Sequence, residues 1–404
     1  MITEENAHSW CVNIDHSMSA DNNGMTKICC MIDTERGNKI LGQDSIKEHF
    51  NREEWQQIRN DLHQGIRNSA CHRCWQEEDA GRDSKRIRDN HRYEHEQKWQ
   101  GLQPYVGLAK IELNLGNTCN IACRTCQPAI SSGWMREHYD LIESDRGISY
   151  KQYADSMKKF HQTYDDNSPF WTDLESYLPT IKQFDFYGGE PFMIKKQWNL
   201  IRKARDLGYA KDIELHYNTN GTHWPEKDLE VWPEFKQINL SFSIDGIGKQ
   251  LEYMRYPAKW NTVKENLDKA RMFRDVHKNM HLGWCITLSN ANIFYLPEIL
   301  DYLVESYNDI GAYLNLVHGP IFHNISIMPD SLKDIVVAKL ETVPDTDRYS
   351  NFKKQMPGII NFIKNGKYNA EAWQRFLDKT KVHDEYRNQD YAKYFSEYAK
   401  LIGI

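Results

Sequence analysis

The sequence contains no long hydrophobic run. No segment approaches the ~18 consecutive apolar residues that a membrane-spanning helix requires. Residues 1–6 are polar and partly acidic, unlike the basic and then apolar start of a secretory signal. We therefore expect a soluble cytoplasmic protein that has no membrane partner.

The sequence also lacks an excess of positive charge, internal repeats and low-complexity tracts. Its 51 Lys and Arg residues are outnumbered by 57 Asp and Glu residues, for a net charge of −6. This balance disfavours a nucleic-acid partner, whose phosphates call for a basic surface. A chain of 404 residues is long enough for two or three domains.

Cysteines are present in a number that indicates metal ligation. Nine cysteines without a secretion signal favour ligands in a reducing compartment over disulfides. Three of them form one short loop at residues 119–126, and five lie before residue 75. Cys285 stands alone inside an apolar run, where we expect a small buried core thiol.

The middle of the chain alternates between strand and helix patterns. Strands are predicted at 109–115, 183–187, 212–219, 237–244, 281–288 and 313–317, and helices at 262–276 and 293–306. Such alternation predicts an α/β fold with a parallel sheet, either open or rolled into a barrel. In both architectures the chemistry lies at the carboxyl ends of the strands.

The cysteine loop follows the first of these strands. Cys119, Cys123 and Cys126 have the spacing C-x3-C-x2-C. Three thiolates can hold three irons of a [4Fe–4S] cube and leave the fourth iron open, as a catalytic centre requires. The alternatives are a structural zinc site or three unrelated core cysteines; zinc would need a fourth ligand, and the nearest histidine, His138, is far along the chain.

Polar residues also end the next three strands. They are Gly188, Gly189 and Glu190 after the second strand, Thr219 and Asn220 at the end of the third, and Ser243, Asp245 and Arg255 at and beyond the end of the fourth. Glycines allow a ligand to approach the backbone closely. A carboxylate accepts hydrogen bonds from an ammonium group, and the planar guanidinium of Arg donates two hydrogen bonds to a carboxylate. Taken singly, these motifs also read as ordinary turns and, for Arg255, as a solvated charge.

As an ordered set, these motifs resemble those of the radical S-adenosylmethionine (SAM) superfamily over roughly residues 8–325. The resemblance implies a partial (β/α)6 TIM-like barrel at 105–322 and a [4Fe–4S] cluster on the three loop cysteines. That cluster would cleave SAM reductively to a 5′-deoxyadenosyl radical. The site residues implied for SAM are Gly188, Gly189, Glu190, Thr219, Asn220, Ser243 and Arg255, with Asp245 as a candidate catalytic residue.

One position departs from the family pattern. The residue before the third cysteine is often aromatic in the family and lies by the adenine, whereas here it is Thr125. We expect the adenine to be covered by other groups, near Ser289–Asn292. The nearly seventy residues between the first two strands are expected to form an insertion that shapes the active site.

The N-terminal cysteines resemble those of radical SAM proteins with a twitch-type (SPASM-like) auxiliary cluster domain. By this resemblance Cys11, Cys29, Cys71 and Cys74 would hold a second [4Fe–4S] cluster, with Cys30 as the less favoured alternative to Cys29. A zinc knuckle would use the same four ligands and the same C-x2-C spacing, so the sequence does not decide between zinc and an iron–sulfur cluster at this site.

The sequence is thus identified as a radical SAM enzyme in three regions. Residues 1–100 form the cluster domain with a charged bridge, 105–322 the barrel, and 325–404 a helical extension whose recurring aromatic residues pack on the barrel flank. The resemblance implies an electron donor such as flavodoxin or ferredoxin and a peptide or protein substrate. The alternatives are a small metabolite, an RNA, or a non-catalytic zinc or iron–sulfur interaction module.

Overall fold

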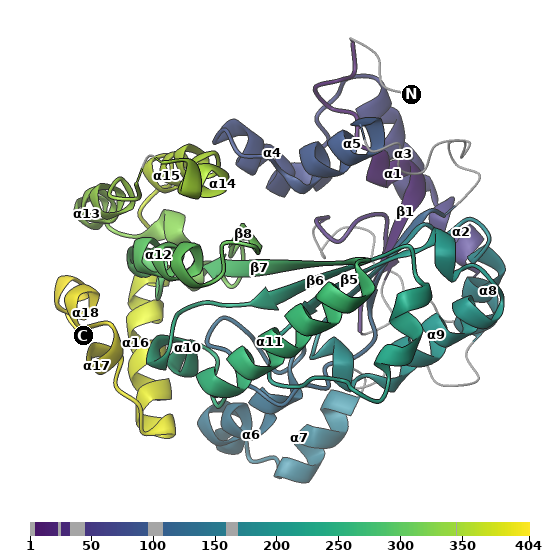
Figure 1. Cartoon of the computed structure of the whole chain (residues 1–404). Helices are drawn as coiled ribbons and strands as arrows, with labels where there is room; N and C mark the ends of the chain where they lie inside the picture. The colour runs from purple at the N-terminus through teal and green to yellow at the C-terminus, as the bar shows by residue number, and fades with distance from the viewer. Residues whose placement is uncertain (1–4, 23–25, 33–44, 96–107, 159–168, 345) are drawn as a thin grey trace.

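The computed structural model describes residues 5–22, 26–32, 45–95, 108–158, 169–344 and 346–404. Its centre is a single twisted sheet with the strand order β2-β1-β3-β4-β5-β6-β7-β8 (Figure 1). The strands are β1 (Ser17–Ala20), β2 (Thr26–Lys27), β3 (Lys110–Asn114), β4 (Gln183–Tyr187), β5 (Glu214–Thr219), β6 (Gln237–Ser243), β7 (Met280–Leu288) and β8 (Gly311–Leu316).

The six strands from β3 to β8 are all parallel and follow one another in chain order. Each corresponds to one predicted strand, so the prediction of an α/β fold with a six-unit parallel barrel is confirmed. The barrel stays open because β8 pairs only with β7 among the described strands. Two side chains form hydrogen bonds with the backbone at the free edge of β8. Leu314 N donates to Gln355 Oε1 (3.1 Å), and Leu314 O accepts from Arg82 (2.7 Å).

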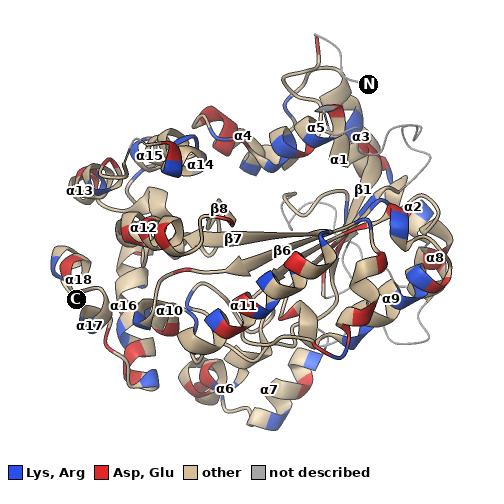
Figure 2. Cartoon of the chain, in the orientation of Figure 1, with Lys and Arg blue, Asp and Glu red and all other residues tan. Residues whose placement is uncertain are grey.

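Strand alternation separates two faces of this sheet. Apolar side chains such as Phe184, Leu215 and Trp284 are buried on the outer face, where helices cover the barrel. The helices that follow or connect the barrel strands are α6 (Met135–His138), α7 (Tyr150–Met157), α8 (Pro169–Tyr177), α9 (Lys195–Asp206), α10 (Lys249–Met254), α11 (Trp260–His277) and α12 (Leu296–Ser306). Lys, Arg, Asp and Glu are mixed along these helices (Figure 2).

The N-terminal region joins the barrel sheet directly. β1 pairs in parallel with β3, from Ser17 opposite Lys110 to Ala20 opposite Leu113, and β2 pairs antiparallel with β1. The region also contains α1 (Val12–His16), α2 (Ile46–Phe50), α3 (Glu53–His63), α4 (His72–Asp79) and α5 (Lys85–His95). The predicted boundary between residues 100 and 105 lies outside the described residues.

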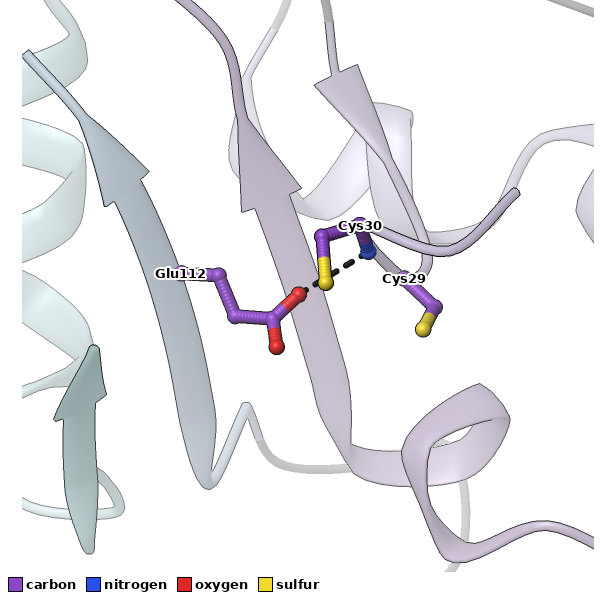
Figure 3. A group of neighbouring side chains, drawn as sticks. All are labelled: Cys29, Cys30 and Glu112. Atoms are coloured by element: carbon purple, nitrogen blue, oxygen red, sulfur yellow. Dashed lines mark hydrogen bonds between the residues drawn. The ribbon is translucent and has the colours of Figure 1, made fainter. Parts of the chain in front are cut away.

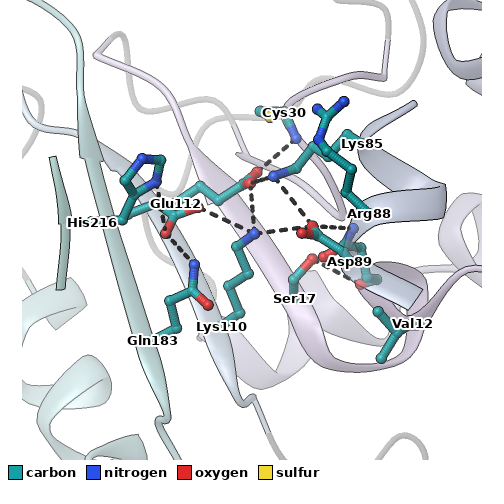
Figure 4. Close-up of polar contacts among 12 residues, drawn as sticks. Val12, Ser17, Cys30, Lys85, Arg88, Asp89, Lys110, Glu112, Gln183 and His216 are labelled. Atoms are coloured by element: carbon teal, nitrogen blue, oxygen red, sulfur yellow. Dashed lines mark hydrogen bonds and ion pairs between the residues drawn. The ribbon is translucent and has the colours of Figure 1, made fainter. Parts of the chain in front are cut away.

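A buried network of charges ties α5 to the inner face of the sheet (Figure 4). Lys110 Nζ lies 3.2 Å from Asp89 Oδ2 and 3.1 Å from Asp185 Oδ2. Lys85 Nζ lies 2.9 Å from Glu112 Oε1 and 3.3 Å from Asp89 Oδ2. Because removing one member would leave a buried charge unpaired, this network fixes the position of the N-terminal region against β3 and β4.

The C-terminal region is helical, as predicted. It comprises α13 (Asp330–Leu340), α14 (Ser350–Lys353), α15 (Met356–Lys364), α16 (Ala370–Arg387), α17 (Tyr391–Tyr394) and α18 (Ser396–Ile402). Tyr391 and Tyr398 are fully buried, and their rings pack against Tyr253 (5.6 Å between centroids) and Phe294 (5.2 Å). The aromatic stripe therefore packs on the barrel flank.

Candidate functional site at the carboxyl ends of the strands

The cysteine loop leaves the carboxyl end of β3 and is held by its neighbours. The hydroxyl of Ser132 accepts from Cys119 N and donates to Cys119 O, both at 3.1 Å. Ala122 N donates to Tyr256 O (2.6 Å). These bonds fix the loop between the start of the insertion and the segment after α10.

The three loop cysteines are each partly buried, and the charges of Cys119 and Cys126 act on the thiol of Cys123. Burial raises the pKa of Cys126 to about 11 and that of Cys119 and Cys123 above the ordinary value, while Arg255 lowers that of Cys123 and Cys126. The guanidinium Nη1 of Arg255 lies 3.7 Å from Cys123 Sγ. Metal binding at this loop must therefore displace thiol protons, and Arg255 favours that step.

Gly188 packs against the end of β3, and Gly189 packs against the start of the cysteine loop. Both have positive φ, +82° and +55°. A Cβ at Gly188 would lie 1.9 Å from Asn114 Oδ1, and one at Gly189 would lie 2.4 Å from Thr118 O. Only glycine therefore fits this turn.

Glu190 connects the ends of β4 and β5. Its carboxylate accepts from Thr219 Oγ1 (2.9 Å), Asn220 N (2.7 Å) and Phe192 N (3.3 Å), and it has no exposed surface. Burial raises the pKa of Glu190 to about 7 against the lowering effect of these bonds. The structure thus brings together Glu190, Thr219 and Asn220, and Asn220 Nδ2 also lies 3.7 Å from Cys119 Sγ.

Arg255 is buried beside the cysteine loop, with 8% of its surface exposed, so the alternative of a solvated charge is wrong. Its Nη2 lies 2.8 Å from Asp245 Oδ2, and its Nε has no hydrogen-bond partner. Asp245 also accepts from Thr287 N (2.9 Å). Asp245 thus positions Arg255. Ser243 is the last residue of β6, and its side chain lies on the inner face of the sheet.

Cys285 is only partly buried, contrary to the prediction of a core thiol. Its neighbours Trp284 and Ile286 turn outward into the core, so alternation along β7 turns Cys285 to the barrel interior. Burial raises its pKa to about 11, and the nearby Asp245 carboxylate adds to this effect.

The four predicted N-terminal ligands gather in one place. Cys11, Cys29 and Cys71 share a small hydrophobic cluster with Ile14, Trp55 and Trp75. The charges of Cys71 and Cys74 raise the pKa of Cys11, as burial does, and burial raises that of Cys71 and Cys74 to about 12 and 11. Thiols from the N-terminal ends of α1 and α4 and from the segment after β2 therefore converge.

The ligand atoms of Cys29, Cys30 and Glu112 lie within 4.8 Å of one another (Figure 3). The backbone N of Cys30 donates to Glu112 Oε2 (2.9 Å), which places Cys30 on the inner side of β3. Cys29 packs with Cys11 instead. Of the two neighbouring cysteines, Cys29 is the better placed to join Cys11, Cys71 and Cys74.

A cavity of about 390 Å³ opens beside Cys126. The insertion contributes Trp134 and His138 to its wall, and α16 contributes Phe376 and Lys379. The predicted role of the insertion in shaping the site agrees with this wall. The residues after β8, including His323, were not singled out in the sequence because a lone histidine far from the cysteines has no motif around it.

The fold and these residues define an α/β barrel with a cysteine loop at the carboxyl end of β3. Residues 113–286 match the family model of the Radical SAM superfamily. This segment of the chain is therefore a radical SAM domain. No helix among the described residues is long and apolar enough to cross a membrane.

Solved structures with a similar fold include native anSMEcpe with bound AdoMet and Cp18Cys peptide, at 13% identity and a TM-score of 0.39. Native anSMEcpe with bound AdoMet matches at 14% identity and a TM-score of 0.40. In both cases the match covers 58% of this chain and 58% of the solved chain. A search by sequence found no match among curated proteins.

Proposed function

We propose that this chain binds SAM across the carboxyl ends of β3 to β7 and uses it to modify a peptide or protein side chain. The main support for the proposal is that the cysteine loop, the Gly188–Gly189 turn, Glu190 and Arg255 lie close together at the ends of the strands. A [4Fe–4S] cluster on Cys119, Cys123 and Cys126 would supply the electron for SAM cleavage when bound, delivered by a donor such as flavodoxin or ferredoxin.

The chain's own residues would orient the methionyl end of SAM. Glu190 would pair with an ammonium group, and the unpartnered Nε–H of Arg255 would donate to a carboxylate. Gly188 and Gly189 leave room for the cofactor against the loop. Dithionite-reduced, iron-reconstituted protein should therefore release 5′-deoxyadenosine from SAM, measured by chromatography; no release above a protein-free control would contradict the proposal.

The Arg255→Ala variant should raise the SAM dissociation constant by about tenfold or more, because a charge-assisted hydrogen bond contributes roughly 1.5–3 kcal/mol. Anaerobic titration calorimetry on the reconstituted variant measures this. Arg271→Ala is the matched control, since Arg271 pairs with Asp309 on the outer surface. Equal SAM affinity in the wild type and in Arg255→Ala would remove Arg255 from the site.

SAM affinity should rise with pH up to about 7 and then level off. Only ionised Glu190 can pair with the SAM ammonium group, and its pKa of about 7 means that binding below pH 7 must first remove a proton. Each pH unit below 7 should then cost up to about tenfold in affinity. A Glu190→Gln variant should bind weakly at every pH; a parallel slope in both proteins would assign the titration to another group.

We also assign Cys11, Cys29, Cys71 and Cys74 to a second [4Fe–4S] cluster. The convergence of these cysteines supports the assignment. Four thiolates close the site, so this cluster would relay electrons or hold the N-terminal region together.

The peptide substrate is supported by a polar groove of about 500 Å³ between α4 and the segment after β8. Ile321 lines both this groove and the cavity beside Cys126. The test is deuterium transfer into 5′-deoxyadenosine from a deuterated cell extract divided by ultrafiltration. We expect transfer from the macromolecular fraction and its loss after protease treatment; transfer from the small-molecule fraction alone would favour a metabolite.

A further inference from the structure

A separate cavity of about 330 Å³ lies at the free edge of β8. Its lining comes from the turn between α4 and α5, from the first part of α5, from β8, and from the residues between α14 and α15. It shares no described lining residue with the cavity beside Cys126. Gly81 of its lining follows Ala80, which lines the polar groove between α4 and the segment after β8, so the cavity adjoins that groove along the chain.

The cavity is lined by more positive than negative charge. Three of its lining residues are basic, Arg82, Arg88 and Lys354, and one is acidic, Asp83. Arg82 is partly compensated, because its Nε lies 3.6 Å from Glu77 Oε2. Lys354 is exposed and forms no ion pair with any described residue. An anion bound here would therefore balance the charge of the lining.

Arg88 is half-buried and is bonded only to neutral groups. Its Nη1 donates to the backbone oxygen of Asp83, and its Nη2 donates to the hydroxyl of Tyr313 (3.0 Å). The guanidinium also lies over the ring of Tyr313, 4.4 Å from the centroid. Within the described part of the chain Arg88 forms no ion pair with a carboxylate. A partly buried charge without a counter-charge is costly, so this cavity favours an anionic ligand.

Tyr313 connects the cavity to the barrel interior. Tyr313 is paired with Cys285, and Cys285 with Ser243, so the three side chains form one row on the inner face of the sheet. Because neighbouring strands lie ~4.8 Å apart, Tyr313 is roughly 10 Å across the sheet from Ser243. Burial raises the pKa of Cys285 and the charge of Arg88 opposes this, so that charge acts on the same row. A ligand held by Arg88 would thus lie close to the proposed SAM site.

We propose that this cavity binds a carboxylate of the peptide substrate, with Arg88 as the main donor and with Arg82 and Lys354 adding positive charge. This assignment rests on the proposed function and narrows its substrate to peptides with a carboxylate near the modified residue. Arg has five N–H donors, and the two bonds of Arg88 leave donors for a carboxylate.

Anaerobic equilibrium dialysis of the iron-reconstituted protein, at low ionic strength and without reductant, tests this. The probes are three short glycine peptides: one with a central glutamate and blocked ends, one with a central glutamine and blocked ends, and the glutamine peptide with a free C-terminus. The wild type should bind a carboxylate peptide about tenfold or more tightly than the fully blocked glutamine peptide, as expected of one charge-assisted hydrogen bond. The peptide that it prefers identifies the source of the carboxylate. Arg88→Met should bind all three equally.

Two exposed lining residues keep the test decisive if Arg88→Met does not fold. Lys354→Met should weaken binding of the preferred peptide about threefold, and Asp83→Asn should strengthen it about threefold, as expected of exposed charges. Lys353→Met is the matched control, because Lys353 is also exposed and its loss changes the net charge equally, but it does not line the cavity. It should bind the peptides as the wild type does.

Equal binding of the three peptides by the wild type, or an unchanged preference in Arg88→Met, would overturn the carboxylate site. Equal losses in Lys354→Met and Lys353→Met would overturn it too, because they would show a general effect of charge. The proposed function is tested separately by the release of 5′-deoxyadenosine from SAM. A wild type that shows the peptide preference but no release would contradict the proposed function and leave the carboxylate site in place.

Discussion

Replacing Cys119, Cys123 and Cys126 together by alanine should abolish SAM cleavage and remove about four of about eight irons per chain. The loss is expected to be complete because no other thiol lies on this loop, and the remaining four-cysteine set is closed. The measurement is iron content after anaerobic reconstitution, together with 5′-deoxyadenosine release under dithionite.

The two cysteines outside both sets provide the control. Cys30 faces Glu112 and Cys285 faces Asp245, so alanine at either position should leave the iron content at about eight per chain. The converse variant, with alanine at Cys71 and Cys74, should keep the loop cluster and its cleavage of SAM under dithionite. Zinc bound at the N-terminal site after anaerobic purification would show that the second cluster is wrongly assigned.

The barrel could be predicted from the sequence because its signals are local. Each inner strand alternates or runs apolar over several residues, and the spacing of the cysteines is itself a local pattern. β1 was missed because Ser17–Ala20 is short and half serine, and it forms a strand only by pairing with β3. Tertiary pairing decides such segments, not their own propensity.

The contacts within the site could not be predicted because they join residues far apart in sequence. Nothing in the sequence links Lys85 to Glu112 or Arg255 to Asp245. The motifs identified the residues at the strand ends but not what each one contacts. Cys285 shows the same limit, since an apolar run in sequence does not reveal which face of the strand looks into the barrel.

Gly189→Ala should cost the protein its loop cluster and with it detectable SAM binding. The new Cβ would lie 2.4 Å from Thr118 O, next to Cys119, and either the turn or the cysteine loop must move.

Gly208→Ala is the matched control: Gly208 also has positive φ (+81°), but no atom lies within 4 Å of its Cβ position. It should therefore lose only the ~1 kcal/mol of stability that a left-handed alanine costs and keep its iron. Iron content and thermal unfolding of both variants separate the steric effect from the backbone effect. If Gly189→Ala retained iron and SAM affinity as Gly208→Ala should, the turn would not support the cysteine loop, and its glycines would serve the backbone conformation alone.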